Sequence, residues 1–318
     1  MTDSSTRFEV GEAEAGMRLD LFLAARLRAF SRARVRTLLR LGRVRKNGRR
    51  VRTGDRLQTG DVLQVELAAT PGELLPRAEP QLPLIVRYVS SALLVVDKPA
   101  AMPTQPLAPD ETGTLVNALL GRYPELRAQE RAVLDPGLLN RLDLETSGLV
   151  LVARHAAAFA ALRAQLEADA VRKVYLALVH GETPTAGEVR WALAHDPRAA
   201  SRMRVQHDPE LGPSLPWRKA HTRFRCVARY EGLSFVEVEI RRGARHQIRA
   251  HLAALGHPIV GDRLYGAADS PRPCDRHFLH AARLELVDPH DAQAIRVEAP
   301  LPPELESWLA ALGRARSL

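Results

Sequence analysis

Three charged residues alternate with leucines in residues 138–152, which read LLNRLDLETSGLVLV. Arg141, Asp143 and Glu145 occupy every second position there. In a strand this period would place all three side chains on one face and the intervening leucines on the other. Because burying an unpaired carboxylate costs several kcal/mol, such residues between apolar runs are expected to be paired or to take part in function.

Two kinds of chemistry fit these carboxylates. Asp143 and Glu145 could flank a sugar bond as the acid pair of a glycosidase does, although both would then come from one short segment. Alternatively, Asp143 acts alone and Glu145 is a supporting or solvent-facing residue. The next residues, Thr146-Ser147-Gly148, favour a turn whose hydroxyl groups could donate hydrogen bonds to Asp143.

Two further segments offer side chains to accompany Asp143. RKVYLALVHG predicts a strand in which Tyr175 lies on the face opposite Val174 and Leu176. RHQIRAHLAALG predicts a helix with an apolar stripe that contains Ile248, and with Arg245 and Arg249 on a neighbouring face. An aspartate, a tyrosine and an arginine are thus available as a set.

A metal site is a weaker interpretation of the same region. His246, His251 and His257 are spaced by five and six residues, which does not place them on one helical face, and no HExxH motif occurs. The only cysteines, Cys226 and Cys274, suggest two reduced thiols and not a disulfide framework or a zinc knuckle. We therefore expect no metal.

Positive charge is concentrated near the start of the chain. The 318 residues carry a formal net charge of +9, and residues 18–56 hold 14 Lys and Arg against two acidic residues. Because arginine is abundant throughout, this clustering, and not the arginine count, predicts a polyanionic partner.

The elements expected in this basic region form a compact surface. RLDLFLAARLRAF and SRARVRTLLRLG read as two helices, with Ser31 as the N-cap of the second helix and Gly42 at its end. VRKNGRRV reads as a hairpin that turns at Asn47-Gly48. The cations expected to contact a sugar-phosphate backbone are Arg32, Arg34, Arg36, Arg40, Arg43, Arg45, Lys46 and Arg49. A solvated basic face with no partner is the alternative.

Residues 17–67 resemble the alpha-L type RNA-binding domain first described in a small-subunit ribosomal protein. The motifs RLD, FSR, GRVRKNG and GD occur in the order of that domain. We expect a small α/β RNA-binding domain over 1–68 and a proline-rich linker over 69–83, where four prolines occur. A larger domain over 84–318 follows. Its strand and helix signals do not alternate regularly, which favours an α+β fold.

Four motifs of the larger domain resemble the RluA family of pseudouridine synthases: RLDLETSGLVLVAR, KVYLALV, HQIRAHLAALGHPIVGDRLYG and LHAARLEL. The resemblance covers about residues 84–310. It implies a mixed, mostly antiparallel central sheet with flanking helices, and isomerisation of a uridine in RNA to pseudouridine. It also implies an enzyme that needs no cofactor.

The resemblance assigns roles to individual residues. Asp143 matches the essential aspartate, either a nucleophile toward the sugar or a base that removes a ribose proton. Tyr175 matches the tyrosine that stacks on the target base, and Arg249 the basic residue that pairs with the aspartate. Leu279 matches an apolar contact beneath the base, and Arg141 an arginine that enters the duplex where the flipped nucleotide leaves. Ile248 and Thr146 complete the expected substrate pocket.

Two departures from the family pattern concern the RNA-facing rim. Asn140 stands where many relatives have His, and Ala244-Arg245 stands where many have Arg-Thr. These departures bear on the choice of RNA. Ribosomal RNA is favoured as the target, transfer RNA is the alternative substrate, and a structured-RNA-binding protein without catalysis is the alternative function. With no long apolar run and a polar start, the sequence predicts a cytoplasmic protein that does not enter membranes. We expect a monomer.

Overall fold

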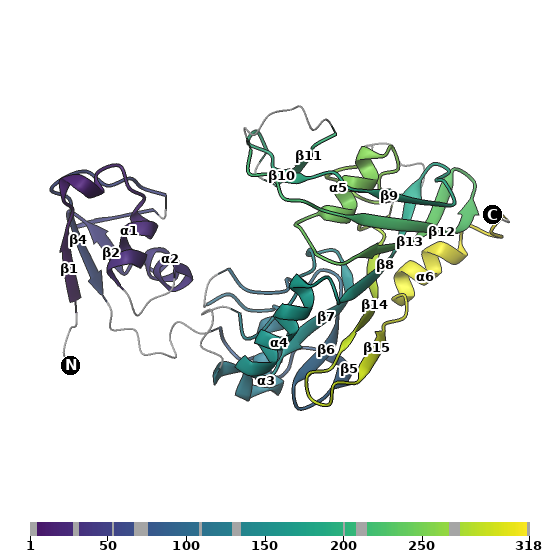
Figure 1. The fold of residues 1–318 in the computed structure, drawn as a ribbon, viewed down its shortest axis with the longest axis horizontal. Helices are drawn as coiled ribbons and strands as arrows, with labels where there is room; N and C mark the ends of the chain where they lie inside the picture. Colours follow the sequence, from purple (N-terminus) through teal and green to yellow (C-terminus); the bar gives the residue numbers. More distant parts are fainter. Residues whose placement is uncertain are drawn as a thin grey trace. The chain divides into compact units, whose positions relative to one another are not determined.

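In the computed structural model, two compact units can be distinguished and are described separately (Figure 1). The first comprises residues 1–83 and 105–137, and the second comprises residues 84–104 and 138–318. The described residues are 5–27, 32–52, 54–66, 76–107, 110–128, 135–199, 201–207, 215–266 and 274–316, without the side chains of 32–34. Ser31 and much of the predicted linker lie outside these ranges, and the predicted domain boundaries remain a prediction.

The basic region folds as two helices against a small antiparallel sheet with strand order β1-β4-β2-β3. Leu19, Phe22 and Leu23 of the first helix and Val35 and Leu38 of the second form its core, as the helical spacing predicts. The elements are β1 (Ser5–Glu9), η1 (Glu12–Glu14), α1 (Leu19–Arg26), α2 (Arg32–Arg40), β2 (Val44–Lys46), β3 (Arg49–Arg50) and β4 (Val62–Glu66).

The predicted hairpin is present between β2 and β3. Lys46 pairs with Arg49, and the two residues between them, Asn47 and Gly48, have φ values of 51° and 77°. Two successive positive φ values are the geometry that Asn-Gly favours in a two-residue hairpin turn.

The rest of the first unit contains α3 (Leu115–Arg122) and η3 (Pro124–Ala128). Thr114 caps α3 by accepting a hydrogen bond from the backbone N–H of Asn117. The Asn117 amide in turn donates to the carbonyl oxygen of Arg77 (2.8 Å), which attaches the helix to residues 76–82.

The second unit is built on a nine-stranded sheet with the order β5-β6-β7-β14-β8-β13-β12-β9, to which β15 adds beside β14. Only the β7–β14 pair is parallel among the described strands. The predicted α+β class with a mixed, mostly antiparallel sheet is confirmed. The sheet strands are β5 (Ile85–Val89), β6 (Leu93–Lys98), β7 (Ser147–Ala153), β8 (Arg172–His180), β9 (Ala186–Val189), β12 (Thr222–Tyr230), β13 (Leu233–Ile240), β14 (Leu279–Val287) and β15 (Ala294–Glu298).

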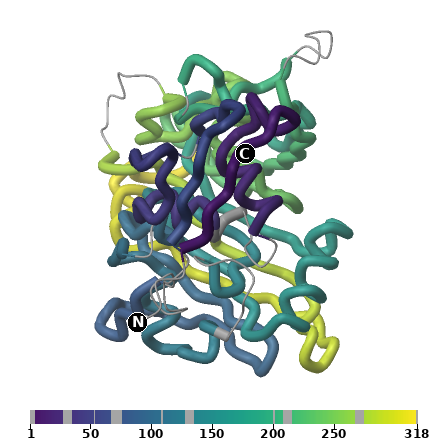
Figure 2. The backbone as a smooth tube through the Cα atoms, turned by 90° about the vertical axis from the view of Figure 1, so that its left-hand side faces the viewer, coloured from purple at the N-terminus to yellow at the C-terminus, as the bar shows by residue number. Residues whose placement is uncertain are grey.

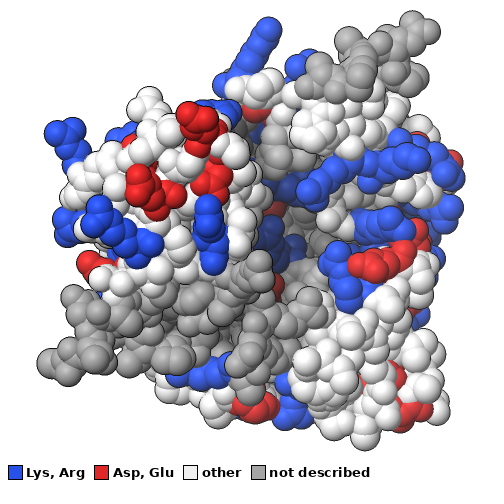
Figure 3. All heavy atoms as spheres, turned by 60° about the vertical axis from the view of Figure 1, so that its left-hand side comes forward, with Lys and Arg blue, Asp and Glu red and all other residues white. Residues whose placement is uncertain are grey.

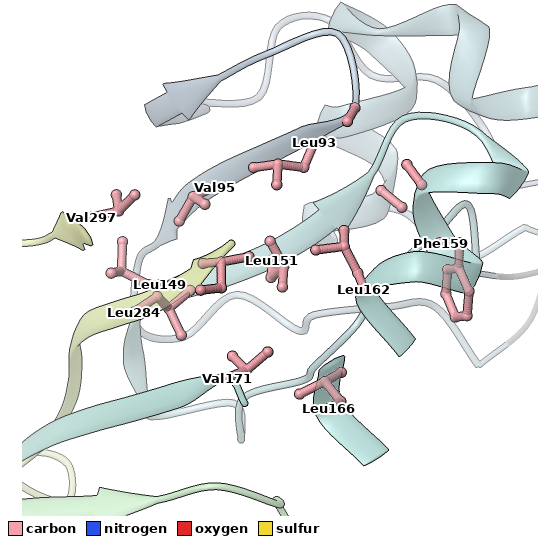
Figure 4. Packing of buried hydrophobic residues seen from close by; sticks show 14 of the residues in the cluster. Leu93, Val95, Leu149, Leu151, Phe159, Leu162, Leu166, Val171, Leu284 and Val297 are labelled. Carbon is pink, nitrogen blue, oxygen red and sulfur yellow. The ribbon is translucent and has the colours of Figure 1, made fainter. Parts of the chain in front are cut away.

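Helix α4 (Ala156–Glu167) packs on this sheet through an apolar cluster (Figure 4). Leu162 and Leu166 of the helix belong to one cluster with Leu151 of β7 and Leu284 of β14, and Leu162 points toward Leu151. The remaining elements of the unit are a two-stranded sheet of β10 (Leu193–His195) and β11 (Met203–Val205), and the helices α5 (Gln247–Ala254) and α6 (Pro303–Ala310).

The late strand β14 lies between two earlier strands, β7 and β8 (Figure 1), so yellow backbone from the end of the chain runs among teal segments in Figure 2. This order brings residue 147, residue 175 and residue 280 onto adjacent strands. Gly148 is required at this junction, because its φ is +112° and a Cβ atom there would lie 2.3 Å from the carbonyl oxygen of Ala281. No helix in the described ranges combines the length and the hydrophobicity needed to cross a membrane.

Candidate active site

Asp143 lies in a loop immediately before β7 and not in a strand. The backbone N–H of Thr146 donates to the carbonyl oxygen of Asp143 (3.1 Å), which closes a turn over 143–146. Leu142 is buried, whereas Leu144 is 53% exposed. The two-residue strand period expected for 141–145 is therefore wrong, because turn formation at Thr146 overrides the alternation of residue types.

Neighbouring chain segments fix the backbone on both sides of Asp143. Thr104 Oγ1 donates to the carbonyl oxygen of Leu142 (2.8 Å) and accepts from its N–H (3.1 Å). The fully buried ammonium of Lys98 donates to the carbonyl oxygens of Pro99 and Met102 (both 2.8 Å) and to that of Leu144 (3.3 Å). Burial lowers the pKa of Lys98 to about 7, and the charge of Arg276 adds to this.

Arg249, on α5, connects Asp143 to a second carboxylate. Its Nη1 donates to Asp143 Oδ2 (2.8 Å), while its Nε and Nη2 donate to the two oxygens of Asp262 (2.7 and 2.9 Å). The side chains of Asp143, Arg249 and Asp262 are 26%, 9% and 0% exposed. The guanidinium is therefore held in place by the buried Asp262 and presented to the more accessible Asp143.

Charge and burial oppose one another in this triad. Burial alone would lower the pKa of Arg249, but its bonds to Asp262 and Asp143 raise it. Burial would likewise raise the pKa of Asp262, but the guanidinium and the N–H groups of Leu264 and Tyr265 lower it. All of these contacts favour the charged forms, so the ion pair persists despite its burial.

Tyr175 is buried on β8, opposite Ala281 of β14 and Val238 of β13. Burial raises the pKa of its hydroxyl group, and the negative charge of Asp143 raises it further. Ala281 also pairs with Gly148 at the start of β7, so Tyr175 lies two strands away from the segment that follows the Asp143 loop. Leu279 pairs with Ala177, two residues from Tyr175, so it lies on the same face of the sheet.

The other predicted pocket residues lie at different depths. Ile248 is buried in α5, and Arg141 is exposed in the loop before Asp143. Thr146 is buried and its hydroxyl group meets His277 Nε2 (2.7 Å), so the predicted hydroxyl bond to the Asp143 carboxylate is not observed. The predicted residues of the 141–146 loop and of α5 are brought into one region by the bond between Arg249 and Asp143.

Glu145 does not resemble one half of a glycosidase pair. Its carboxylate approaches Nδ1 of His277 (3.1 Å), and burial lowers the pKa of His277 to about 4. The neutral imidazole thus lies between Glu145 and Thr146. Glu145 supports the turn that carries Asp143, in line with the supporting role weighed above.

The predicted helix over 245–256 is shorter than expected. Helix α5 begins at Gln247, so Arg245 precedes it and does not share a helical face with Arg249. His246 at the junction has a left-handed backbone, with φ 53° and ψ 20°. Of the other two histidines, His251 is buried against Thr222, and His257 meets the carbonyl oxygen of His180. Within the described ranges, no three His, Cys, Asp or Glu residues gather as a metal site would require.

Comparison with known proteins identifies the family. A sequence profile described as RNA pseudouridylate synthase matches residues 92–254, and one described as S4 domain matches residues 17–63. The chain belongs to the RNA pseudouridylate synthase family. The resemblance to pseudouridine synthases and to a small RNA-binding domain is thereby confirmed.

Individual relatives agree with this assignment. The synthase is 42% identical to an uncharacterized RNA pseudouridine synthase of Chloroflexus aurantiacus over 68% of the chain and 65% of that relative. It is 37% identical to the ribosomal large subunit pseudouridine synthase D of Xanthomonas campestris over 98% of the chain and 93% of that protein. Among solved structures, human RNA pseudouridylate synthase domain containing 1 has a TM-score of 0.54 and 26% identity, covering 74% of this chain and 97% of that chain.

The synthase's site includes residues that sequence reasoning did not select. Asp262, Tyr265, His246 and Lys98 surround Asp143 and Arg249, and the Tyr265 ring lies 5.4 Å from the Arg249 guanidinium. Asp262 and Tyr265 occur in GDRLYG, directly after the segment that carries Arg249. The Gly-Asp pair at the start of this motif is typical of a turn, and in the structure Asp262 accepts hydrogen bonds from the N–H groups of Leu264 and Tyr265.

The synthase's basic small domain uses its cations in two ways. Arg36 pairs with Asp20 (3.2 Å), Arg43 with Glu66 (3.6 Å) and Lys46 with Asp61 (3.0 Å). Arg40, Arg45 and Arg49 are exposed and have no carboxylate partner in the described part of the chain. The side chains of Arg32 and Arg34 lie outside the described residues.

Exposed Lys and Arg side chains are prominent on the face of the molecule that Figure 3 shows. Among the cations predicted to contact RNA, Arg40, Arg45 and Arg49 therefore remain available for phosphate groups, whereas Arg36, Arg43 and Lys46 are partly neutralised within the protein.

Proposed function

We propose that this pseudouridine synthase modifies specific uridines in ribosomal RNA, using Asp143 as its one catalytic carboxylate and no cofactor. The observation that carries this proposal is the pairing of a partly exposed Asp143 with a buried Arg249 beside the buried Tyr175. Several relatives of similar length are named ribosomal large subunit pseudouridine synthase D, which supports the choice of RNA. A cytoplasmic monomer is part of the same proposal.

The reaction is an isomerisation whose atoms balance without any co-reactant. The bond from uracil N1 to ribose C1′ breaks, the base turns, and a bond from C5 to C1′ forms. C5 loses a proton and N1 gains one, so no electron acceptor or group carrier is consumed. Asp143 acts either as a nucleophile at the ribose or as a base toward a ribose proton, and both alternatives use the same carboxylate.

The pocket residues serve the base once it has left the stack. Extruding a uridine costs a few kcal/mol, which contacts to the flipped base must offset. Tyr175 offers its ring to the uracil, while Leu279, on the same sheet face, supports the base from below. Arg141 is exposed at the start of the loop, where it can enter the space that the uridine leaves. Ile248 and Thr146 close the pocket behind Asp143.

Tritium release tests the proposed catalytic residue. Uridine labelled at C5 loses its label when C5 bonds to ribose, so the wild-type protein should release tritium from ribosomal RNA. Asp143→Ala should reduce release by at least about 10⁴-fold, since no other group supplies the same chemistry. Asp291→Ala, in an exposed turn, is the matched control and should keep wild-type release. Substantial release by Asp143→Ala would refute the assignment.

The RNA target is tested separately. Pseudouridines should be mapped across total RNA in cells with the gene, without it, and with Asp143→Ala in its place. Sites that disappear in the second and third cells should lie in ribosomal RNA. Disappearance only in transfer RNA would favour the alternative substrate, whereas RNA binding with an unchanged map would favour the non-catalytic alternative.

Arg40, Arg45 and Arg49, the predicted RNA-contacting cations that have no carboxylate partner in the described residues, are proposed to contact RNA phosphates. Substituting Gln for Arg40, Arg45 and Arg49 together should weaken RNA binding and reduce its salt dependence. The slope of log K against log [salt] should fall by about 0.7 to 0.9 for each phosphate group that is no longer bound. Arg7→Gln is the control, because Arg7 is exposed on β1, at the opposite edge of the small sheet. A triple variant with an unchanged slope would contradict the proposed contacts.

A further inference from the structure

His246 occupies an unusual position at the start of α5. Its left-handed backbone is uncommon for a residue with a side chain and costs on the order of 1 kcal/mol. The side chain is only 10% exposed and packs edge-on against Tyr265, with ring centroids 5.8 Å apart. Such a conformation persists where the surrounding contacts hold it, and these contacts come from the site itself.

Tyr265 determines which nitrogen of His246 carries the proton. The Tyr265 hydroxyl oxygen accepts a hydrogen bond from the backbone N–H of Met203 (2.7 Å) and lies 3.1 Å from His246 Nδ1. No other acceptor for the hydroxyl hydrogen is found in the described part of the chain. Because Tyr265 is partly shielded from solvent and its hydroxyl oxygen already accepts from Met203, we infer that its hydroxyl hydrogen is donated to His246 Nδ1. The neutral imidazole then carries its hydrogen on Nε2.

The Nε2–H group faces the oxygen of Asp143 that Arg249 leaves available. Nε2 lies 3.8 Å from Asp143 Oδ1, whereas Arg249 binds Oδ2 at 2.8 Å. At 3.8 Å the contact is too long for a hydrogen bond, so both the Nε2–H group and Oδ1 remain available to bind another molecule. Burial lowers the pKa of His246, and the charges of Arg249 and Arg245 lower it further. The charge of Asp143 raises this pKa but does not cancel the other effects, so the neutral ring is favoured.

We propose that His246 is a further catalytic residue, whose Nε2–H donates a hydrogen bond to the uracil while Asp143 Oδ1 faces the ribose. This inference rests on the proposed function of Asp143. When the N1–C1′ bond breaks with both electrons remaining on the base, negative charge spreads over the uracil N1 and its carbonyl oxygens. A donor fixed before the reaction stabilises that charge most effectively. Tyr265 is the positioning residue that keeps the donor on the correct nitrogen.

Substitutions separate this role from a structural one. His246→Phe removes the donor and should lower kcat by about 10²- to 10³-fold with a small effect on KM. His246→Gln restores an N–H donor of similar reach and should recover at least about tenfold of that decrease. Tyr265→Phe keeps the ring beside Arg249 and should lower kcat by about three- to tenfold, the effect of one hydrogen bond. Thermal melting checks that each variant folds.

The tautomer gives a readout that a packing role would not change. Long-range ¹H–¹⁵N spectra at neutral pH should show His246 with its hydrogen on Nε2 in the wild type and a mixture of both tautomers in Tyr265→Phe. A hydrogen on Nδ1 in the wild type, or a folded His246→Phe variant with wild-type kcat, would overturn the proposal. Tritium release that is abolished in Asp143→Ala but unaffected in His246→Phe would refute this inference while leaving the proposed function intact.

Discussion

Asp20 in the small domain and Asp143 in the larger unit both pair with arginines, yet their surroundings differ. Asp20 is fully buried and binds two half-exposed guanidinium groups, with Arg18 Nε at 3.0 Å and Arg36 Nε at 3.2 Å. Asp143 is partly exposed and binds one buried arginine through Oδ2. The first carboxylate is enclosed by its partners, whereas the second keeps an oxygen for another molecule.

The difference depends on a third residue. At Asp143 the arginine is itself bound by Asp262, which takes two of its nitrogens and also accepts from two backbone N–H groups. Arg249 is therefore positioned without help from Asp143. A carboxylate that does not have to hold its partner can act on substrate, and we infer that this distinguishes a reactive ion pair from a structural one.

Removing Arg249 should have the largest effect. Arg249→Met leaves the buried Asp262 without a cation, so we expect stability to fall by about 3 to 5 kcal/mol and turnover by at least about 10³-fold. Arg249→Lys keeps the charge but lacks the planar fork that contacts both carboxylates, so it should restore part of the stability and little of the activity. Chemical denaturation and tritium release measure the two effects. Equal recovery of both would contradict the separate roles of the two carboxylates.

The equivalent change at Asp20 should affect stability alone. Asp20→Asn weakens the charge-assisted hydrogen bonds from Arg18 and Arg36 in the small domain, so we expect stability to decrease by about 1 to 3 kcal/mol. At saturating RNA, kcat should stay within about twofold of the wild type, because Asp20 belongs to the small domain's own core. Glu9→Gln, at an exposed position of β1, should change neither quantity. A large fall in kcat for Asp20→Asn would show that this pair also serves the reaction.

Much of this arrangement could be predicted from residue patterns. The helical spacing of the small domain and the strand predicted for RKVYLALVHG match the observed helices α1 and α2 and the strand β8, because each follows from local periodicity. Asp143, Tyr175 and Arg249 were also found as a set, since family motifs carry each of them. The turn over 143–146 was predicted less well, because the alternation of charged residues and leucines in 141–145 is typical of a strand.

The contacts that tune the site could not be predicted in the same way. His246 and Tyr265 are 19 residues apart and meet only through the fold. Lys98 reaches the loop before β7 over a separation of 46 residues. Likewise, no local pattern shows that Arg36 and Lys46 are paired whereas Arg40 and Arg45 are not, because the acidic partners Asp20 and Asp61 are 15 or 16 residues away in the chain.

Two buried lysines extend the comparison and provide the smallest expected effect. The Lys98 ammonium has three carbonyl acceptors, whereas Lys173, 5% exposed, has no hydrogen bond or ion pair in the described part of the structure. Burial lowers the pKa of Lys173 to about 8, and the charge of Asp169 only partly opposes this. A buried amine without a partner destabilises the folded state whenever it is charged.

Lys173→Met should therefore raise stability at pH 7.5, by about 1 to 2 kcal/mol, because an apolar side chain of similar length replaces the charge. Since the unfolded lysine titrates near pH 10.5 and the folded one near 8, the unfolded state binds more protons between these values. Wild-type stability should then rise with pH through this window, and the advantage of Lys173→Met should shrink toward pH 10.5.

Lys98→Met should instead be destabilising, because three carbonyl oxygens lose their donor. Thermal melting of both variants at about pH 7.5 and 10 measures these trends. A destabilised Lys173→Met would mean that the amine has a partner, such as an ordered water molecule or an acceptor in the same pocket, and that the contrast with Lys98 does not hold.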